Sequence, residues 1–297
     1  MSAVCAVVVT HNRPQLLREC LEGLLAQTEP CKILVVDNAS SQETAELLRE
    51  FDDQITSIRL EMNSGGAGGF AAGLRRAVQD PAADFFWLLD DDTVPAKSCL
   101  EELIKADDRF KRAGATPYFL ASKVVWTDGR RHPMNQGMLD ERHDFAEIAA
   151  ESGCVALKAA SFVSVLVPRK AVADYGLPIA DFFIWGDDVE FTLRVGLHHP
   201  GALVPTSIAV HKTVQFKASA PGPRLFYLAR NWVWIVRFSP AFAGRRRRAF
   251  LRQLIVIVRA VVRGRSGSAV LAGGRGLVAG LTRKPDISEV RAPVPTS

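Results

Sequence analysis

The chain has 297 residues, of which 48% are hydrophobic and 23% charged, and its formal net charge is +5. This length and balance are typical of a globular protein with one large core or two unequal ones, and they exclude global disorder. The five cysteines are scattered, without paired metal-ligand spacing, which favours a reducing cytoplasm over a disulfide framework.

The sequence predicts neither a secretory signal nor a membrane-spanning helix. The N-terminal stretch MSAVCAVVVT has no basic residue ahead of its apolar run, and that run has the length of a strand. The apolar run Leu254 to Val258 is followed at once by Arg259. A membrane span needs roughly 20 apolar residues, so this run is too short to be one.

The first ninety residues predict an alternation of strands and helices. Apolar, β-branched runs at 3–10, 31–40, 55–62 and 84–92 predict strands, and helical spacing predicts helices at 13–27 and 41–51. Residues 63–79 predict a glycine-rich turn that leads into a third helix. Such an order is typical of a parallel sheet covered on both faces, which binds ligands at the carboxyl ends of its strands. The polar clusters fall at those ends: Thr10 to Arg13, Asp37 to Ser40, Asn63 to Gly69, and Asp90 to Thr93.

The alternation weakens beyond residue 108. Strands are predicted at 118–126 and 161–168, on either side of a polar stretch at 127–152 that has the character of a long functional loop. Residues 182–212 then predict an aromatic turn, an acidic turn, a helix and a strand that ends in a histidine. Aromatic and basic helices follow Pro223.

Three consecutive aspartates, Asp90, Asp91 and Asp92, end the apolar run FFWLL. Adjacent like charges repel, so these carboxylates need a partner. Acids at the end of a buried strand form a hard-oxygen site for Mg²⁺ or Mn²⁺, and Asp90 and Asp92 converge if the chain turns there. A solvated turn with a helix cap is the alternative. Capping needs one such residue and not three, so we favour the metal site.

The stretch NSGGAGGFAAG places Gly65, Gly66, Gly68 and Gly69 ahead of a helix. Glycines allow the backbone N–H groups to approach a ligand closely, and a helix N-terminus favours phosphate. The alternative is tight packing of the helix on the sheet. A dinucleotide fingerprint on Gly66 and Gly68 is a weak match, because it follows the third strand rather than the first.

The segment FFIWGDDVEFTLR places Asp187 and Asp188 behind Trp185 and a glycine, at the start of a helix. A carboxylate beside a flat aromatic platform suits a general base acting on a sugar, and helix-dipole stabilisation of the acids is the alternative. His211 ends the strand ALVPTSIAVHK. A lone histidine there is more often structural, but a nearby carboxylate site makes it a candidate third metal ligand.

These motifs together resemble the inverting GT-A glycosyltransferases usually called family 2. The resemblance covers about residues 4 to 213 and rests on VVVTHNRP, ILVVDNAS, NSGGAGGFAAG, WLLDDDT, WGDDVEFTLR and IAVH in that order. The motifs are most similar to those of the actinobacterial galactofuranosyltransferases that start the cell-wall galactan. The motifs of rhamnosyltransferases of the same family are close to them. The resemblance implies an α/β, Rossmann-like GT-A domain at 1–215, with a mostly parallel sheet and helices on both faces.

The resemblance also implies roles for individual residues. Asp188 matches the catalytic base, with Trp185 and Asp187 on the acceptor side. Asp90, Asp92 and His211 match the ligands of a Mn²⁺ or Mg²⁺ ion. The residues that match the nucleotide-sugar site are Thr10, Arg13, Asp37, Asn38, Asn63, Gly65, Gly66, Asp90 and Asp91. The implied reaction is a single displacement on a UDP-α-sugar, with inversion to a β product, and the acids at 90–92 and 187–188 should face one cleft.

The C-terminal region, 216–297, is predicted to be helical, basic and aromatic, with a loose tail. From Arg224 onward the only acids are Asp286 and Glu289, whereas arginine and lysine abound. Aliphatic residues among arginines suit a helix that lies on an anionic membrane surface, beside a polyprenyl-diphosphate-linked glycan acceptor. The alternative is a helical cap on the catalytic core. No nucleic-acid-binding motif accompanies the basic residues, so we expect no nucleic acid partner.

The sequence therefore predicts a glycosyltransferase at the cytoplasmic face of the membrane, with galactofuranose from UDP-galactofuranose as the expected sugar. Transfer of rhamnose from dTDP-rhamnose is the alternative within the same mechanism. An NAD-dependent oxidoreductase and a non-catalytic lipid- or sugar-nucleotide-binding protein are alternatives of other classes. Linkage position, number of sugars, acceptor lipid and assembly as a homo-oligomer stay open.

Overall fold

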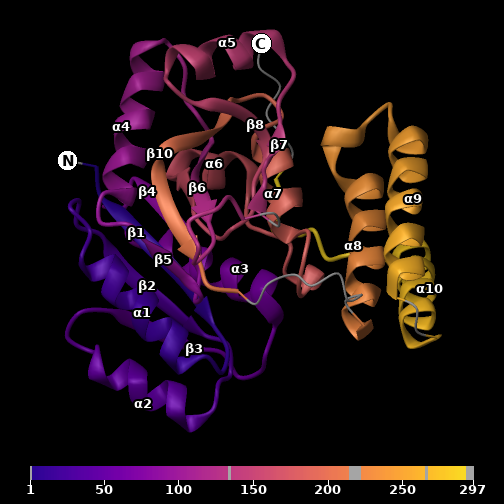
Figure 1. Cartoon of the computed structure of the whole chain (residues 1–297), viewed down its shortest axis with the longest axis horizontal. Helices are drawn as coiled ribbons and strands as arrows, with labels where there is room; N and C mark the ends of the chain where they lie inside the picture. Colours follow the sequence, from indigo (N-terminus) through magenta and orange to yellow (C-terminus); the bar gives the residue numbers. More distant parts are fainter. Residues whose placement is uncertain (1, 133–134, 214–221, 265–266, 292–297) are drawn as a thin grey trace.

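The computed structural model describes residues 2–132, 135–213, 222–264 and 267–291. A unit built on one mixed sheet is followed by helices α8, α9 and α10, which lie side by side on one flank of that unit (Figure 1). The domain boundary expected at 215 and 216 and the loose tail expected at the C-terminus fall largely or wholly outside the described residues.

The first part of the chain alternates strands and helices as predicted. Its elements in order are β1 (Val4–Thr10), α1 (Pro14–Leu25), β2 (Lys32–Asp37), α2 (Gln42–Glu50), β3 (Thr56–Arg59), α3 (Gly65–Ala77) and β4 (Phe85–Asp90). All neighbouring pairs in the order β3-β2-β1-β4 are parallel. Their carboxyl ends therefore meet at one edge, where Thr10 pairs in register with Asp37, and Val9 with Asp90.

The second part is less regular. Its elements are β5 (Thr93–Pro95), α4 (Cys99–Arg112), β6 (Phe119–Val125), β7 (Met138–Leu139), α5 (His143–Glu151), β8 (Val155–Ala159), β9 (Val165–Pro168), α6 (Arg169–Tyr175), the 3₁₀ turn η2 (Ala180–Phe182), α7 (Asp187–Val195) and β10 (Gly201–His211). The sheet continues as β9-β6-β10-β8-β7, and β5 pairs with β10.

The expectation of a mostly parallel sheet is wrong for this second part. Strand β9 lies between β4 and β6 and is antiparallel to both, and β10 is antiparallel to β5 and β8. Strand β9 is buried on both faces, so its apolar run VLVP resembles a parallel strand. Periodicity reports burial and not strand direction, which explains the error.

Two hydrophobic layers enclose the sheet. Alternate residues of β1 point to opposite faces, so Ala6 and Val8 pack with α1, α2 and α4, whereas Val7 and Val9 pack with α3, α6 and α7. Trp87, at the centre of β4, is fully buried, and its indole N–H donates to Ser164 Oγ at 2.9 Å. This rigid sandwich fixes the strand ends that carry the polar clusters.

The glycine-rich stretch is the start of α3 rather than a loop ahead of it. A Cβ on Gly69 or Gly73 would lie 2.3 or 2.4 Å from Cγ1 of Val9 or Val7, so these two glycines allow α3 to pack closely on β1. A Cβ on Gly66, by contrast, would meet nothing within 4 Å. Helix–sheet packing thus explains part of the motif, and Gly66 keeps an open side.

The C-terminal helices α8 (Leu225–Phe238), α9 (Arg246–Gly264) and α10 (Gly267–Thr282) form a layered unit. Helix α10 packs closely on α8 because Gly276 and Gly280 face it; a Cβ on Gly276 would lie 2.3 Å from the carbonyl oxygen of Phe226. After α10 the chain returns to the sheet unit, where Glu289 pairs with Arg75 and its carbonyl accepts from Leu177 N. Among the described residues, no helix has the length and apolarity needed to cross a bilayer.

Candidate active site

The acidic cluster and His211 come together through strand pairing. Strand β4 ends at Asp90, the chain turns through Asp91 and Asp92, and β5 then runs antiparallel to β10 with Thr93 opposite His211. The backbone N–H of Lys212 donates to the carbonyl of Asp92 at 2.8 Å and closes this pairing. The convergence of residues 90 and 92 with a histidine far along the chain is therefore a property of the sheet.

Asp90, Asp92 and His211 each offer one ligand atom, and these three atoms lie within 4.8 Å of one another. His211 Nε2 lies 3.0 Å from Asp92 Oδ1, whereas Nδ1 lies 2.8 Å from Asn135 Oδ1. If Nδ1–H donates to Asn135, the lone pair of Nε2 faces a carboxylate oxygen, and two acceptors need a proton or a cation between them. Two carboxylates and one imidazole with this geometry fit Mn²⁺ or Mg²⁺.

The pKa shifts show that the three aspartates differ in how far neighbouring groups offset the cost of burying their charge. Burial, and then the charge of Asp92, raise the pKa of Asp90 to about 7, and burial raises that of Asp91 to about 6. Burial alone would also raise the pKa of Asp92, but the hydrogen bond and charge of His211 outweigh it, so that pKa is lowered. The site has more buried negative charge than its own cations neutralise.

Asp91 has a different set of partners from its neighbours. Thr10 Oγ1 donates to Asp91 Oδ2 at 2.8 Å, and the backbone N–H of His11 approaches the same oxygen at 3.4 Å. Arg13 Nη1 lies 3.2 Å from Asp91 Oδ1 and 2.8 Å from Asp92 Oδ2. Asp91 therefore fixes the β1 loop to the β4 turn, whereas Asp90 and Asp92 are the two acids whose carboxylate oxygens gather beside His211.

The residues expected beside the nucleotide form a second group at the same edge. Asn38 Nδ2 donates to the carbonyl of Gly65 at 2.8 Å, and its Oδ1 accepts from Ser64 N at 2.8 Å. Asn63 Oδ1 accepts from Gly65 N at 2.8 Å. These amides connect the end of β2 to the start of α3 and fix the backbone that surrounds Gly66.

Asp37 already has partners in the fold. Its Oδ1 accepts from Ser40 N at 2.8 Å, and its Oδ2 pairs with Arg59 at 2.7 Å. Asp37 is 2% exposed, so its visible role is to hold the β2 turn. A contact from Asp37 to a nucleotide stays a prediction.

Asp187 and Asp188 begin α7, and Trp185 precedes them in a half-buried position. Burial raises the pKa of Asp188 to about 6, although backbone N–H groups at the helix start oppose the shift. Burial and then the charge of Asp188 raise the pKa of Asp187 well above its usual range. The charge of Asp188 also contributes to the raised pKa of Asp90, so the two carboxyl groups lie close enough to interact electrostatically.

The sequence analysis missed three residues that shape this site. Arg59 neutralises Asp37, Asn135 contacts His211, and Asn231 of α8 binds the turn before Asp187. Asn135 lies in the polar stretch at 127–152, which was expected to be a functional loop. The sequence therefore indicated the loop but not which of its residues takes part in the site. Lone asparagines and arginines in a sequence carry no such signal, because their partners are distant in the chain.

Residues 5–166 match the family model described as Glycosyl transferase family 2. The galactofuranosyltransferase GlfT1 of Mycobacterium tuberculosis (strain ATCC 25618 / H37Rv) is 32% identical to this chain over 199 residues, which are 65% of this chain and 64% of that protein. GlfT1 of Mycolicibacterium smegmatis is 31% identical over 198 residues, which are 65% of each chain. This chain thus spans less than two thirds of the length of either curated relative.

Solved structures share the fold at lower identity. TarS 1-349 of S. aureus in complex with UDP aligns with a TM-score of 0.58 at 16% identity, over 85% of this chain and 70% of that chain. GalNAc-T7 with UDP, GalNAc and Mn²⁺ aligns with a TM-score of 0.60 at 15% identity, over 84% of this chain and 51% of that chain. The architecture around the acidic cluster is therefore a known one.

Proposed function

The chain belongs to glycosyl transferase family 2, and we propose on that premise that it is a metal-dependent, inverting glycosyltransferase. The observation that supports this most directly is the group formed by Asp90, Asp92 and His211, whose ligand atoms lie within 4.8 Å of one another. The family match includes the aspartates but ends at residue 166, before His211 and Asp188. The position of His211 beside the two aspartates therefore supports the proposal independently of the match.

Asp90, Asp92 and His211 would hold Mn²⁺ or Mg²⁺. Asn135 would orient the imidazole through its contact with Nδ1 of His211. When bound, the cation would neutralise negative charge on the diphosphate of the donor and of the leaving nucleotide. The structure of GalNAc-T7 contains UDP and Mn²⁺ together, which supports this pairing of metal and nucleotide for the present fold. Arg13, half exposed beside Asp92, would contact the nucleotide side of the same site.

Asp188 would act as the general base. A carboxylate with a pKa of about 6 is ionised at neutral pH and still basic enough to accept the proton of an acceptor hydroxyl. Burial, and then the charge of Asp188, raise the pKa of Asp187 well above its usual range, and this residue would form hydrogen bonds to the acceptor instead. One base and one displacement at the anomeric carbon invert its configuration, and no enzyme nucleophile is required.

We propose a UDP-sugar as the donor and UDP-galactofuranose as its identity, since the two relatives described above are named galactofuranosyltransferases. The donor would lie between the ends of β1 and β2 and the start of α3, near Gly66, whose open side leaves room for a close approach of the ligand to the backbone. The donor-side residues are Thr10, Arg13, Asp37, Asn38, Asn63, Gly65, Gly66, Asp90 and Asp91. Trp185 and Asp187 would face the acceptor.

We propose a polyprenyl-diphosphate-linked glycan as the acceptor, reached from the cytoplasmic face of a membrane. Helices α9 and α10 carry more than half of the large, exposed apolar side chains of the described residues: Leu251, Ile255, Val258, Val270, Leu271, Val278 and Leu281. On α9, Leu251, Ile255 and Val258 have helical spacing and share one face. A stripe of this kind suits shallow insertion into a bilayer surface.

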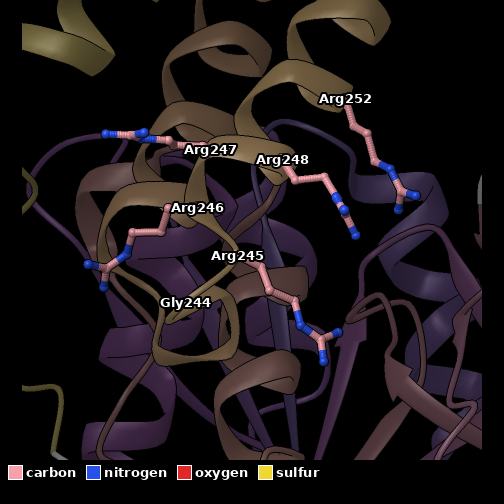
Figure 2. A pocket seen from close by; sticks show the side chains of 6 residues that line it. All are labelled: Gly244, Arg245, Arg246, Arg247, Arg248 and Arg252. Atoms are coloured by element: carbon pink, nitrogen blue, oxygen red, sulfur yellow. The ribbon is translucent and has the colours of Figure 1, made fainter.

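Charge favours an anionic surface. Five exposed arginines border a hollow of about 750 Å³ at the start of α9, together with Gly244: Arg245, Arg246, Arg247, Arg248 and Arg252 (Figure 2). Figure 2 shows their guanidinium groups spread around the helix start, without an acidic side chain among those that line the hollow. The hollow shares no lining residue with the acidic cluster, so we assign it to lipid phosphate and not to the donor.

A transfer assay with a synthetic lipid-diphosphate disaccharide tests the proposal. UDP-galactofuranose and dTDP-rhamnose would be supplied separately with Mn²⁺, and the masses of the products would be measured by mass spectrometry. A mass gain of one hexose with UDP-galactofuranose supports the proposed donor. Turnover with dTDP-rhamnose alone would reject the donor and keep the reaction class, and turnover with neither donor would reject the acceptor or the function.

A further inference from the structure

The turn that carries the proposed base has an unusual backbone. We call residues 182–186 the aromatic turn. Phe183 has φ 63° and ψ −69° at the centre of a γ-turn closed by a 2.8 Å hydrogen bond from Ile184 N to the carbonyl of Phe182. Trp185 also has a positive φ, 65°, and Gly186 follows at 92°. Such a conformation at a non-glycine residue costs on the order of 1–3 kcal/mol, so surrounding contacts must hold it.

Helix α3 supplies one of those contacts. The carbonyl of Phe183 accepts from Ala67 N at 3.1 Å, at the start of the helix that borders the donor site. This oxygen lies so close to Gly65 that a Cβ there would be 2.0 Å from it. The aromatic turn therefore rests against the donor side of the site through its backbone.

Helix α8 supplies the larger set of contacts on the opposite side. Asn231 Nδ2 lies 2.9, 2.8 and 2.7 Å from the carbonyl oxygens of Phe182, Ile184 and Trp185. Arg230 Nε donates to Asn231 Oδ1 at 2.9 Å, which fixes the orientation of the amide. Asn231 is 1% exposed, so water does not replace these hydrogen bonds.

The remaining contacts come from the same face of α8. Arg230 Nη2 donates to the carbonyls of Asp181 and Phe182 at 2.7 and 2.9 Å. The ring of Tyr227 stacks on Phe183 at 5.0 Å, and Trp234 packs edge-on against Phe182 at 5.8 Å. Tyr227, Arg230, Asn231 and Trp234 are spaced as one helical face, so α8 presents a matched surface to the aromatic turn.

We propose that Asn231 is a positioning residue for sugar transfer: it holds the aromatic turn in the conformation that aims Asp188 at the acceptor. The inference rests on the proposed function of Asp188. The two N–H groups of the amide lie within hydrogen-bond distance of three carbonyls ahead of α7, and Asp188 is the second residue of that helix. Loss of the donors would release the backbone, and a displacement of about 1 Å at a reacting group costs up to roughly 100-fold in rate.

The test compares Asn231→Asp with Val233→Ala. Asn231→Asp keeps the shape of the side chain but replaces the N–H donors by a carboxyl oxygen, which turns an acceptor toward the three carbonyls. Val233→Ala is a matched change at a buried residue of the same helix whose side chain lies against Gly280 of α10. We expect Asn231→Asp to lower kcat by about 10- to 100-fold and to change the Kd for UDP by less than about 2-fold. Val233→Ala should lower the Tm while kcat stays near the wild-type value. Asn231→Ser, which retains one donor, should fall between the wild type and Asn231→Asp, and it replaces Asn231→Asp if that variant does not fold.

A second readout does not depend on activity. 5-Fluorotryptophan incorporation gives a ¹⁹F resonance for Trp185, assigned by its loss in Trp185→Phe, and this resonance should shift or broaden in Asn231→Asp but not in Val233→Ala. A folded Asn231→Asp with unchanged kcat and unchanged resonance would overturn the inference, as would an equal loss of kcat in Val233→Ala. If the wild type transfers no sugar, the proposed function fails, and the fluorine signal still decides whether Asn231 holds the turn.

Discussion

His211 Nε2 lies 3.0 Å from Asp92 Oδ1, although the two residues are 119 positions apart in the sequence. The pairing of β5 with β10 produces this contact, and burial keeps water from screening it. Burial lowers the pKa of His211, but the hydrogen bond and charge of Asp92 outweigh it and raise that pKa overall. The imidazole nitrogen that lies beside Asp92 is also the one that would bind a cation, so a proton and a metal ion compete for it.

Replacement of His211 by alanine should weaken Mn²⁺ binding at least 100-fold, because it removes one of the three side chains that form the site. Electron paramagnetic resonance titration of free Mn²⁺ measures this directly. His143→Ala is the control, since that imidazole is exposed on α5. Equal Mn²⁺ affinity in His211→Ala and the wild type would contradict the assignment of the site. Chelation with EDTA should likewise abolish transfer, and added Mn²⁺ or Mg²⁺ should restore it.

Replacement of Asp188 by asparagine should lower kcat by about 10²- to 10⁴-fold, the usual contribution of a general base. Binding of UDP, measured by calorimetry, should change little, because Asp188 is not among the donor-side residues. Asp144→Asn, in the first turn of α5, is the matched control for an acid near a helix start. Normal transfer by Asp188→Asn would assign the base to another residue.

The rate of transfer should fall as the pH drops through about 6. The active form of Asp188 is the carboxylate, and burial raises its pKa to about 6, so acid protonates the base and lowers kcat about tenfold per pH unit below that value. A pH–rate profile at saturating substrate measures this limb. If the limb moves with Mn²⁺ concentration, the metal ligands and not Asp188 are responsible for it.

Replacement by alanine should have opposite effects on the stability of the fold at two neighbouring glycines. Gly65 has φ 71°, and its Cβ would lie 2.0 Å from the carbonyl of Phe183, so Gly65→Ala should destabilise the fold by about 1–3 kcal/mol or more. Gly66 has open space and a helical position, so Gly66→Ala should stabilise the fold by about 0.5–1 kcal/mol. Urea unfolding of both variants measures the difference. If Gly65→Ala is as stable as the wild type, the aromatic turn moves away from residue 65 at little cost and the predicted clash is wrong.

The arginines of α9 should control binding to anionic vesicles. Each basic residue at such a surface contributes about 1 kcal/mol, so replacing Arg245 to Arg248 with glutamine should lower partitioning by about a thousandfold. Flotation with vesicles of phosphatidylglycerol and phosphatidylcholine, and with phosphatidylcholine alone, measures it. The control replaces four exposed basic residues of the sheet unit: Arg49, Lys97, Arg112 and Lys170. Equal flotation of both variants would reject the proposed surface.

The sequence predicted the carboxyl edge of the sheet well, because β1, β2 and β4 are short apolar strands that end in polar residues. It also predicted that Asp90, Asp92 and His211 lie together, which the structure confirms. Their roles, and those of Asp187 and Asp188, stay predictions. The direction of β9 was not predictable, because a doubly buried strand has the same composition in either orientation.

The site residues that the sequence did not reveal are held by contacts between distant segments. Asn135 approaches His211 from a polar loop, and Asn231 reaches the aromatic turn from α8. Both are single amides in unremarkable surroundings of sequence. Only the fold shows that Asn135 contacts Nδ1 of His211 and that Asn231 faces three carbonyl groups.

The hydrogen bonds of Asn231 have a consequence for how the chain can be divided. A shortened protein that stops at the end of β10 would contain all the acids and the histidine of the site. It would nevertheless leave the carbonyls of Phe182, Ile184 and Trp185 without their amide donor. If Asn231 positions Asp188 as proposed, the smallest unit able to support chemistry extends into the helices, and α8 belongs to the catalytic part of the chain as well as to the C-terminal helical unit.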